Sequence, residues 1–280
     1  MKQLMMCVIL LCISVGSGCA NSQSMSQSMS GLGTGTGTGP DLSVGYFSAH
    51  SEALPNGKVL LPAPPRPDPG LPAFAADQAI NLDTFKLRGT KRWELAAQDA
   101  DLKFPAAAGT FACALGVAVT EKDTPHLYTL LHRSLADAAH SADSAKGEYR
   151  RLRPLAVNGQ PSCTPNDEPF LRGSWSYPSG HATIGWAWAL ILSEVAPDRI
   201  DALLARGLAF GQSRVICNAH WQSDVNAGRI MGAGSVAALH NNGEFRKDLE
   251  AAQKEVAEAR NKGLQPQRDC AAEAAALAEH

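Results

Sequence analysis

A nearly unbroken apolar run, Gly180–Val195, constrains the fold of this 280-residue chain more than any other stretch. The run is apolar around nearly its whole circumference and includes Trp186 and Trp188, so we expect a helix buried in the centre of the molecule. Ser179 stands at the N-cap position of this helix, and Pro197 follows its end. The amides of the first turn would then point out of a positive helix end, which favours anion binding.

The rest of the chain also has helical periodicity. Apolar residues recur at three- and four-residue spacing, and the alternation typical of strands is nearly absent. We expect helices in the segments 77–90, 91–102, 105–119, 125–140, 198–212, 225–240 and 244–262. The chain is long enough to bury a single core. The sequence therefore predicts an all-α, single-domain helical bundle over residues 77–262, followed by a tail at residues 263–280.

The first twenty residues are typical of a bacterial secretion signal. Lys2 precedes an apolar stretch that is too short for a membrane span in a folded enzyme, and small residues follow it. Cys19 resembles the lipid-modified cysteine of bacterial lipoproteins, which would anchor a periplasmic protein to the outer membrane. Cleavage after Ala20 would instead release a soluble periplasmic protein. We favour the lipoprotein because of the segment that follows.

Two segments of unusual composition separate this signal from the expected helices. Residues 21–40 consist largely of Ser, Gln, Met, Gly and Thr, which have too little apolar surface to offset the loss of chain entropy. We expect a flexible tether, which suits an anchored end. Residues 41–76 contain seven prolines between Pro55 and Pro72, so we expect an irregular, extended arm along the surface of the bundle.

Four cysteines lie in the domain that follows the signal and the tether: Cys113, Cys163, Cys217 and Cys270. An even number in an exported protein indicates two disulfides, although three pairings are possible. One of the four, Cys217, lies three residues before a candidate catalytic histidine. We interpret it as a bridged or buried thiol and not as a nucleophile.

The stretch from residue 213 to 224 reads S-R-V-I-C-N-A-H-W-Q-S-D and carries the side chains for acid–base and anion chemistry. If a helix starts at about His220, then His220 and Asp224 share one face, and the carboxylate would fix the imidazole tautomer. The second ring nitrogen would be free as a base or nucleophile. Arg214 would offer a planar fork of donors to an anion. Taken alone, the stretch also fits a surface arginine and a helix-capping pair.

A second block, K-G-E-Y-R-R-L-R-P, runs from residue 146 to 154. Lys146 and Arg153 are seven residues apart, so two helical turns would bring them onto one face. Pro154 disfavours helix at Arg153, which we therefore expect where a helix passes into a loop. The intervening Arg150 and Arg151 would either widen a positive rim or be solvated near a helix end.

Three blocks together resemble the signature of the type 2 phosphatidic acid phosphatase superfamily, which also contains vanadium haloperoxidases. The matching residues are, in order, Lys146 with Arg153 and Pro154; Pro178, Ser179, Gly180 and His181; and Ser213 and Arg214 with His220 and Asp224. The longer strings around the second and third blocks look most like the secreted bacterial class A non-specific acid phosphatases. The likeness covers roughly residues 41–260, and it implies a helical bundle with an N-terminal arm.

This resemblance also implies roles for the matched residues. The phosphate-binding residues would be Lys146, Arg153, Ser179, Gly180 and Arg214. His220 would attack phosphorus to form a phosphohistidine, with Asp224 orienting its ring, and His181 would protonate the leaving alcohol. These duties require a neutral His220 and a charged His181 at the start of the reaction. The family pattern implies no metal and no cofactor, and it implies inhibition by inorganic phosphate or vanadate.

Other functions remain to be separated from this one. A vanadium-dependent haloperoxidase has the same kind of pocket in a longer chain, and a membrane lipid phosphatase would need several apolar spans. A non-catalytic phosphate-binding lipoprotein would not need both histidines and Asp224. The near-neutral net charge of −2 argues against nucleic acid as a partner. We expect small phosphomonoesters as substrates and membrane contact only through a lipid anchor. The sequence leaves open the natural substrate, which depends on loops such as 157–171, phosphate transfer to alcohols, and a homo-oligomer.

Overall fold

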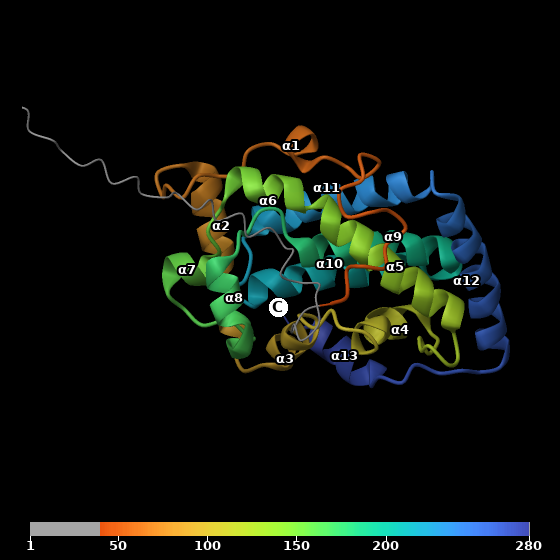
Figure 1. Ribbon diagram of the computed structural model, residues 1–280. Helices are drawn as coiled ribbons and strands as arrows, with labels where there is room; N and C mark the ends of the chain where they lie inside the picture. Colours follow the sequence, from red (N-terminus) through yellow and green to blue (C-terminus); the bar gives the residue numbers. More distant parts are fainter. Residues whose placement is uncertain (1–39, 280) are drawn as a thin grey trace, which may run out of the picture.

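A computed structural model describes residues 40–279, and every regular element among them is a helix. The α-helices are α1 Gly57–Leu60, α2 Pro72–Asp83, α3 Lys91–Gln98, α4 Ala112–Leu115, α5 Pro125–Ser141, α6 Asp143–Tyr149, α7 Pro154–Asn158, α8 Glu168–Gly173, α9 Gly180–Val195, α10 Ile200–Ile216, α11 Gln222–Leu239, α12 Gly243–Asn261 and α13 Cys270–Leu277. Four 3₁₀ turns are η2 Thr84–Leu87, η3 Ala106–Phe111, η4 Pro165–Asp167 and η5 Pro197–Arg199. The expectation of an all-α fold is confirmed (Figure 1).

Helix α9 forms the centre of the bundle, as its apolar sequence predicts. It packs against α5, α10, α11 and α12, and Figure 1 shows it among them. Its Trp188 is only 1% exposed, and the indole Nε1–H donates to the carbonyl of Leu131 on α5 at 3.0 Å. The polar atom of this large buried side chain is therefore satisfied, as burial requires. The helix ends at Val195, before Pro197.

Glycines allow α11 to approach the N-terminal half of α9 closely. A Cβ atom on Gly228 would lie 2.6 Å from the carbonyl oxygen of Ser179, and one on Gly232 would lie 2.6 Å from that of Thr183. Both distances are too short for carbon and oxygen, so a larger residue would push the two helices apart. This close approach brings the start of α11 next to the start of α9, and both ends carry residues of the predicted site.

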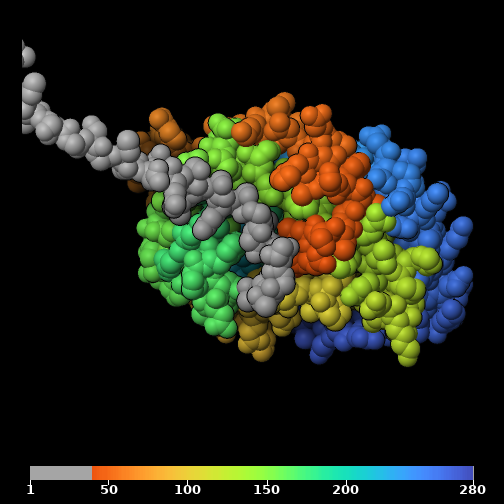
Figure 2. Space-filling model, in the orientation of Figure 1, coloured from red at the N-terminus to blue at the C-terminus, as the bar shows by residue number. Residues whose placement is uncertain are grey.

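The N-terminal arm is ordered along the surface. The amides of Tyr46 and Phe47 donate to the buried carboxylate of Asp137 on α5, at 2.8 and 2.9 Å. In Figure 2 the arm, red to orange, lies over α6 and α11, which α1 contacts. Residues 41–76 are irregular apart from α1 and the start of α2. The second helix begins at Pro72 and not at residue 77, because proline is well suited to the first position of a helix.

Several expected helices are shorter or broken. The segment 77–90 divides into the end of α2 and η2, and 91–102 is helical only to Gln98. The segment 105–119 becomes η3 and the short α4, which ends at Gly116 in a left-handed conformation with φ of 82°. In contrast, α10 continues to Ile216, beyond the expected end at residue 212. These differences occur where side-chain contacts between elements override local periodicity.

The C-terminal segment 263–280 contains a helix, α13, that packs against α3. A disulfide between Cys113 and Cys270 ties it to α4, and a second disulfide joins Cys163 to Cys217. The expectation of two disulfides is confirmed, and their pairing is now defined. Between residues 40 and 279, none of the helices is both long and apolar enough to span a lipid bilayer. The predicted signal, Cys19 and nearly all of the tether lie outside the described residues.

Candidate active site

The three predicted blocks meet at the N-terminal end of α9. Lys146 of the first block donates through Nζ to the carbonyl of Pro178 in the second, at 2.6 Å. The amide of Ser179 donates to the carbonyl of Asp224 in the third, at 3.0 Å. Arg153 of the first block contacts His220 of the third at 2.7 Å. Each block therefore touches the other two, although they are far apart in the sequence.

Ser179 caps α9 as the sequence predicts. It is fully buried with extended backbone, and its hydroxyl accepts the amide of Ala182 at 3.3 Å. The first amides of a helix, here including those of Gly180 and His181, have no partner within the helix. They place partial positive charge at the same end of α9 that the cationic side chains approach.

Three buried cations surround this helix end, and they differ in their hydrogen bonding. The Arg153 guanidinium donates to Ser174 Oγ and to the carbonyls of Trp175 and Ala219 as well as to His220. In contrast, Arg214 is 2% exposed, and its Nε and Nη1 atoms have no hydrogen-bond partner. Buried donors without an acceptor are costly, so these two N–H groups indicate the position of an anion.

Burial lowers the pKa of all three cations. Burial and the neighbouring Arg153 lower the pKa of Lys146 to about 7, although Asp143 and Asp224 oppose the shift. Burial and Arg214 lower the pKa of Arg153 to about 9, and burial lowers that of Arg214 to about 10. A bound anion would stabilise the charged forms and reverse these shifts.

The contacts of His220 define its tautomer. Its Nε2 lies 2.7 Å from Arg153 Nη1, and a guanidinium can only donate, so Nε2 accepts and the ring proton is on Nδ1. Nδ1 faces Ser176 Oγ at 3.4 Å and Asp224 Oδ2 at 3.6 Å. Burial, together with the charges of Arg153, Lys146 and Arg214, holds the pKa of His220 well below its ordinary value. These contacts indicate a neutral ring whose lone pair lies on Nε2, where it accepts from Arg153.

The predicted geometry of His220 and Asp224 needs a correction. His220 is not in a helix, because α11 begins at Gln222, and the two residues do not share a helix face. Asp224 instead lies in the first turn of α11 and accepts the amide of Trp221 at 2.8 Å and the hydroxyl of Ser176. The carboxylate still lies beside Nδ1 of His220, but capping interactions hold it there.

Arg151 is a residue of this site that the sequence placed either on a positive rim or in solvent near a helix end. It is buried and donates to Asp224 Oδ1 at 2.5 Å, Ser223 Oγ at 2.6 Å and Asp77 Oδ2 at 2.7 Å. Arg150, in contrast, is exposed. The signal that was available is Pro154, which favours extended chain before it. Side chains two residues apart in extended chain share a side, so Arg151 and Arg153 both point inward.

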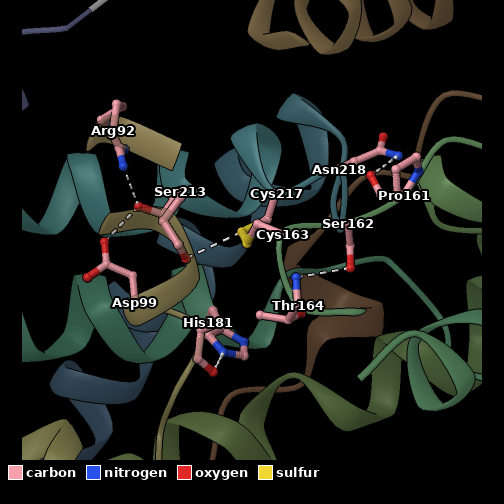
Figure 3. Close-up of a disulfide and its surroundings, with 12 residues drawn as sticks. Arg92, Asp99, Pro161, Ser162, Cys163, Thr164, His181, Ser213, Cys217 and Asn218 are labelled. Carbon is pink, nitrogen blue, oxygen red and sulfur yellow. Dashed lines mark hydrogen bonds between the residues drawn. A yellow bond between two sulfur atoms is a disulfide. The ribbon is translucent and has the colours of Figure 1, made fainter. Parts of the chain in front are cut away.

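His181 lies in the first turn of α9 and is partly buried. Its Nε2 is 3.0 Å from the backbone carbonyl of Ala100, in the turn after α3 (Figure 3). Because a carbonyl only accepts, Nε2 carries a proton. Burial, and then the charge of Arg214, hold the pKa of His181 well below its ordinary value, although the Ala100 carbonyl opposes the shift. The protein alone therefore favours neutral His181, and a bound anion would be needed to raise its pKa.

The disulfide Cys163–Cys217 connects the 157–171 loop to the end of α10, next to the site (Figure 3). Asn218, the following residue, has a left-handed backbone with φ of 57°, which asparagine tolerates. Its side chain exchanges hydrogen bonds with Asn158 and accepts one from Asn81. These contacts fix the short segment that leads to His220. The disulfide to Cys163 and the full burial of Cys217 confirm that this cysteine is bridged and buried.

All the predicted site residues thus gather around one end of α9. Between residues 40 and 279, no group of three or more His, Cys, Asp and Glu side chains is arranged to hold a metal ion.

The comparisons with known proteins agree with the family that the three sequence blocks resemble. The family model described as the PAP2 superfamily matches residues 126–247. The non-specific acid phosphatase of Providencia stuartii is 46% identical over 219 residues, which cover 78% of this chain and 86% of that protein. The acid phosphatase of Zymomonas mobilis is 44% identical over 74% of this chain and 78% of its own length. The non-specific acid phosphatase of Salmonella typhimurium is 41% identical over 74% and 82%.

Proposed function

This chain belongs to the PAP2 superfamily, and we propose that it is a metal-independent acid phosphatase that hydrolyses small phosphomonoesters through a phosphohistidine. One observation carries the proposal: His220 keeps an unprotonated Nε2 in a buried setting beside three cations. An imidazole lone pair there would be a nucleophile directed at a bound anion. The names of its relatives support a broad range of phosphate esters as substrates.

In this proposal the phosphoryl group binds where the unpaired donors of Arg214 point. Lys146 and Arg153 supply further positive charge, and the Ser179 hydroxyl and Gly180 amide complete the contacts at the start of α9. A phosphomonoester carries up to two negative charges, and these three side chains neutralise them without a metal. Their support grows as charge redistributes on the oxygens in the transition state.

The first step forms a bond between His220 Nε2 and phosphorus. Arg153 exchanges its contact with Nε2 for one with a phosphoryl oxygen, which frees the lone pair for attack. The bond from phosphorus to the ester oxygen breaks, and that oxygen keeps the electron pair. His181 donates a proton to it, so an alcohol leaves. Asp224, beside Nδ1, stabilises the positive charge on the phosphorylated ring.

The second step releases the enzyme. His181, now neutral, removes a proton from water as the water oxygen attacks the phosphohistidine. The bond between phosphorus and Nε2 breaks, its electron pair returns to the ring, and inorganic phosphate leaves. Because burial and Arg214 depress the pKa of His181, protonated His181 requires bound substrate and a mildly acidic solution.

One set of assays tests this proposal. The purified protein should hydrolyse p-nitrophenyl phosphate below neutral pH, with full activity in EDTA and with inhibition by vanadate or inorganic phosphate. Rapid acid-free quenching should trap a base-stable phosphoenzyme in the wild-type protein and none in His220→Asn. Activity that is lost on chelation and restored by a divalent metal would contradict the metal-free mechanism. Halide oxidation with vanadate and peroxide, without phosphatase activity, would support a haloperoxidase instead.

We also propose that the protein is exported and held at the outer membrane through lipid on Cys19. The two disulfides support an oxidising compartment outside the cytoplasm. Wild-type protein should remain in the membrane fraction until detergent is added, and Cys19→Ser should appear in the soluble periplasm if the signal is still cleaved. Wild-type protein that is soluble without detergent would favour the alternative, cleavage after Ala20.

A further inference from the structure

His181 is oriented by a backbone carbonyl and not by a carboxylate. Its partner, the carbonyl of Ala100, lies 3.0 Å from Nε2 in a turn beyond the end of α3. The local backbone bond that involves Ala100 runs from its amide to Ala97, at 3.2 Å. A turn of this kind does not by itself fix the direction of a carbonyl, so another contact must hold this peptide in place.

The neighbouring residue, Asp99, supplies that contact. Its carboxylate is 1% exposed and accepts three hydrogen bonds from α10: two from the guanidinium of Arg206, at 2.5 and 3.1 Å, and one from the hydroxyl of Ser213, at 2.6 Å. Figure 3 shows Asp99 and Ser213 joined in this way, with His181 nearby. The end of α3 is thereby attached to the helix that carries Arg214.

Arg206 is itself fixed from the C-terminal side of the molecule. It is 2% exposed, and its Nε lies 3.4 Å from Oε1 of Glu273 on α13. The Cys113–Cys270 disulfide is at the first residue of this helix. The contact with Glu273 is an ion pair without a hydrogen bond, and the two hydrogen bonds to Asp99 fix the guanidinium against that carboxylate.

We propose that Asp99, clamped by Arg206, is a positioning residue for His181: it holds the Ala100 carbonyl against Nε2 and leaves Nδ1 to meet the substrate. This inference rests on the proposed role of His181 as the general acid. An N–H that donates to Ala100 cannot also donate to the ester oxygen. The proton that reaches the leaving group therefore comes from Nδ1, and the carbonyl stabilises the imidazolium that supplies it.

Asp99 supports the position of His181 more than that of Arg214, although its charge also favours the protonated guanidinium of Arg214. Ser213, its other partner, is inside α10, where the helix itself fixes the backbone next to Arg214. Ala100 lies beyond the end of α3 and has no such support. Loss of the Asp99 carboxylate should therefore leave phosphate binding largely intact and impair proton delivery.

The test compares two leaving groups in the phosphorylation step, measured by rapid quench. A p-nitrophenolate departs without a proton, whereas the alkoxide of glycerol phosphate needs one. His181→Asn gives the reference ratio for loss of the acid. Asp99→Asn should lose about tenfold or more on glycerol phosphate and less than about threefold on p-nitrophenyl phosphate. Adding Asp99→Asn to His181→Asn should cause no further selective loss, because the two changes remove one function.

Two further variants separate this role from stability. Arg206→Lys keeps the charge but loses the fork that holds Asp99, so it should show the same selectivity to a smaller degree, and it carries the test if Asp99→Asn does not fold. Asp137→Asn is the matched control, because that carboxylate is also buried but holds Tyr46 and Phe47 of the arm. It should lower the melting temperature without changing the ratio between the two substrates.

The outcomes distinguish this inference from the proposed function. If His181→Asn is selective but Asp99→Asn and Arg206→Lys lose activity equally on both substrates, the positioning role of Asp99 is wrong and the proposed function stands. If His181→Asn itself shows no selectivity, the acid role of His181 is wrong, and the inference falls with it. Selectivity in Asp137→Asn would show that general loosening of the fold causes the effect, which also overturns the inference.

Discussion

At the scale of single residues, the cations of the site are not equivalent. Arg153 already donates to Ser174, to two carbonyls and to His220, so it holds the segments of the proposed site together. Arg214 keeps two buried N–H groups without acceptors. An arrangement of this kind costs stability in the free protein and is offset when an anion binds.

We therefore expect Arg214→Ala and Arg153→Ala to differ in stability although both lose activity. Each should lose about 3 kcal/mol or more of transition-state stabilisation, which lowers kcat/KM. Arg153→Ala should also lower the melting temperature, because it leaves several buried acceptors unpaired. Arg214→Ala should leave it unchanged or raise it. Steady-state kinetics and thermal unfolding of the phosphate-free proteins measure both effects, and equal destabilisation would contradict this division.

Arg151 gives a second contrast within one short segment. Arg151→Met would leave the buried carboxylates of Asp77 and Asp224 without their shared partner, so we expect it to destabilise the fold by about 3 kcal/mol and to lower kcat. Arg150→Ala, at an exposed position, should change the rate only a few-fold. Urea unfolding and kinetics of the two variants test this expectation. A stable, active Arg151→Met protein would mean that Asp224 needs no cationic support.

Lys146 should make anion binding depend on pH. Burial, followed by the charge of Arg153, lowers its pKa to about 7 in the free protein. Below that pH the ammonium is present and attracts an anion. Above it, binding must take up a proton, so the affinity should fall by up to about tenfold per pH unit. Inhibition by sulfate, which does not titrate in this range, measures the effect from about pH 5 to about pH 9.

The control for this experiment is Lys146→Met, which removes the titrating group. It should bind sulfate more weakly at acidic pH, and the decrease in affinity above pH of about 7 should become smaller. An undiminished decrease in this variant would assign the titration to another residue, such as one of the two histidines.

At the scale of helices, the accuracy of the bounds expected from the sequence depended on the length and burial of each helix. The long apolar or amphipathic segments α5, α9 and α12 begin and end close to their expected positions, because many residues support one periodicity. Short elements such as α1, α7 and α13 were not predicted, since a few residues carry little periodic signal. Helix α11 begins at Gln222, between the two starts that the sequence suggested, about His220 and residue 225, because Asp224 caps the helix from inside its first turn.

The contact between α9 and α11 should tolerate no additional atoms. Gly232→Ala would place a Cβ atom 2.6 Å from the carbonyl oxygen of Thr183, so we expect a loss of stability and of activity as the two helix starts separate. Gly147→Ala, in α6, meets nothing within 4 Å and should be neutral or stabilising by about 0.4–1 kcal/mol. Thermal unfolding and kcat of both variants test this. Equal effects at the two positions would show that helix propensity outweighs the close approach.

At the scale of the whole molecule, the sequence identified the members of the site but not all of their partners. Matching blocks named His220, His181 and the three cations, because their chemistry needs specific residue types at specific spacing. The pairing of the four cysteines and the inward direction of Arg151 depend on contacts between distant segments. Asp99 carries no local signal at all, since its partners lie on α10, more than one hundred residues further along the chain.

The disulfide between Cys113 and Cys270 joins residues that are 157 positions apart in the sequence. Just after the end of α13, Glu279 accepts the amide of Arg92 on α3 at 2.8 Å. Synthesis runs from the N-terminus, so these contacts form only after the ribosome has added residues 270–279. A nonsense mutation at the codon for Cys270 would therefore leave every residue of the signature blocks in place and still remove the support of Arg206. In genetic terms, we expect the codons for residues 270–279 to be as sensitive to mutation as those of the signature blocks.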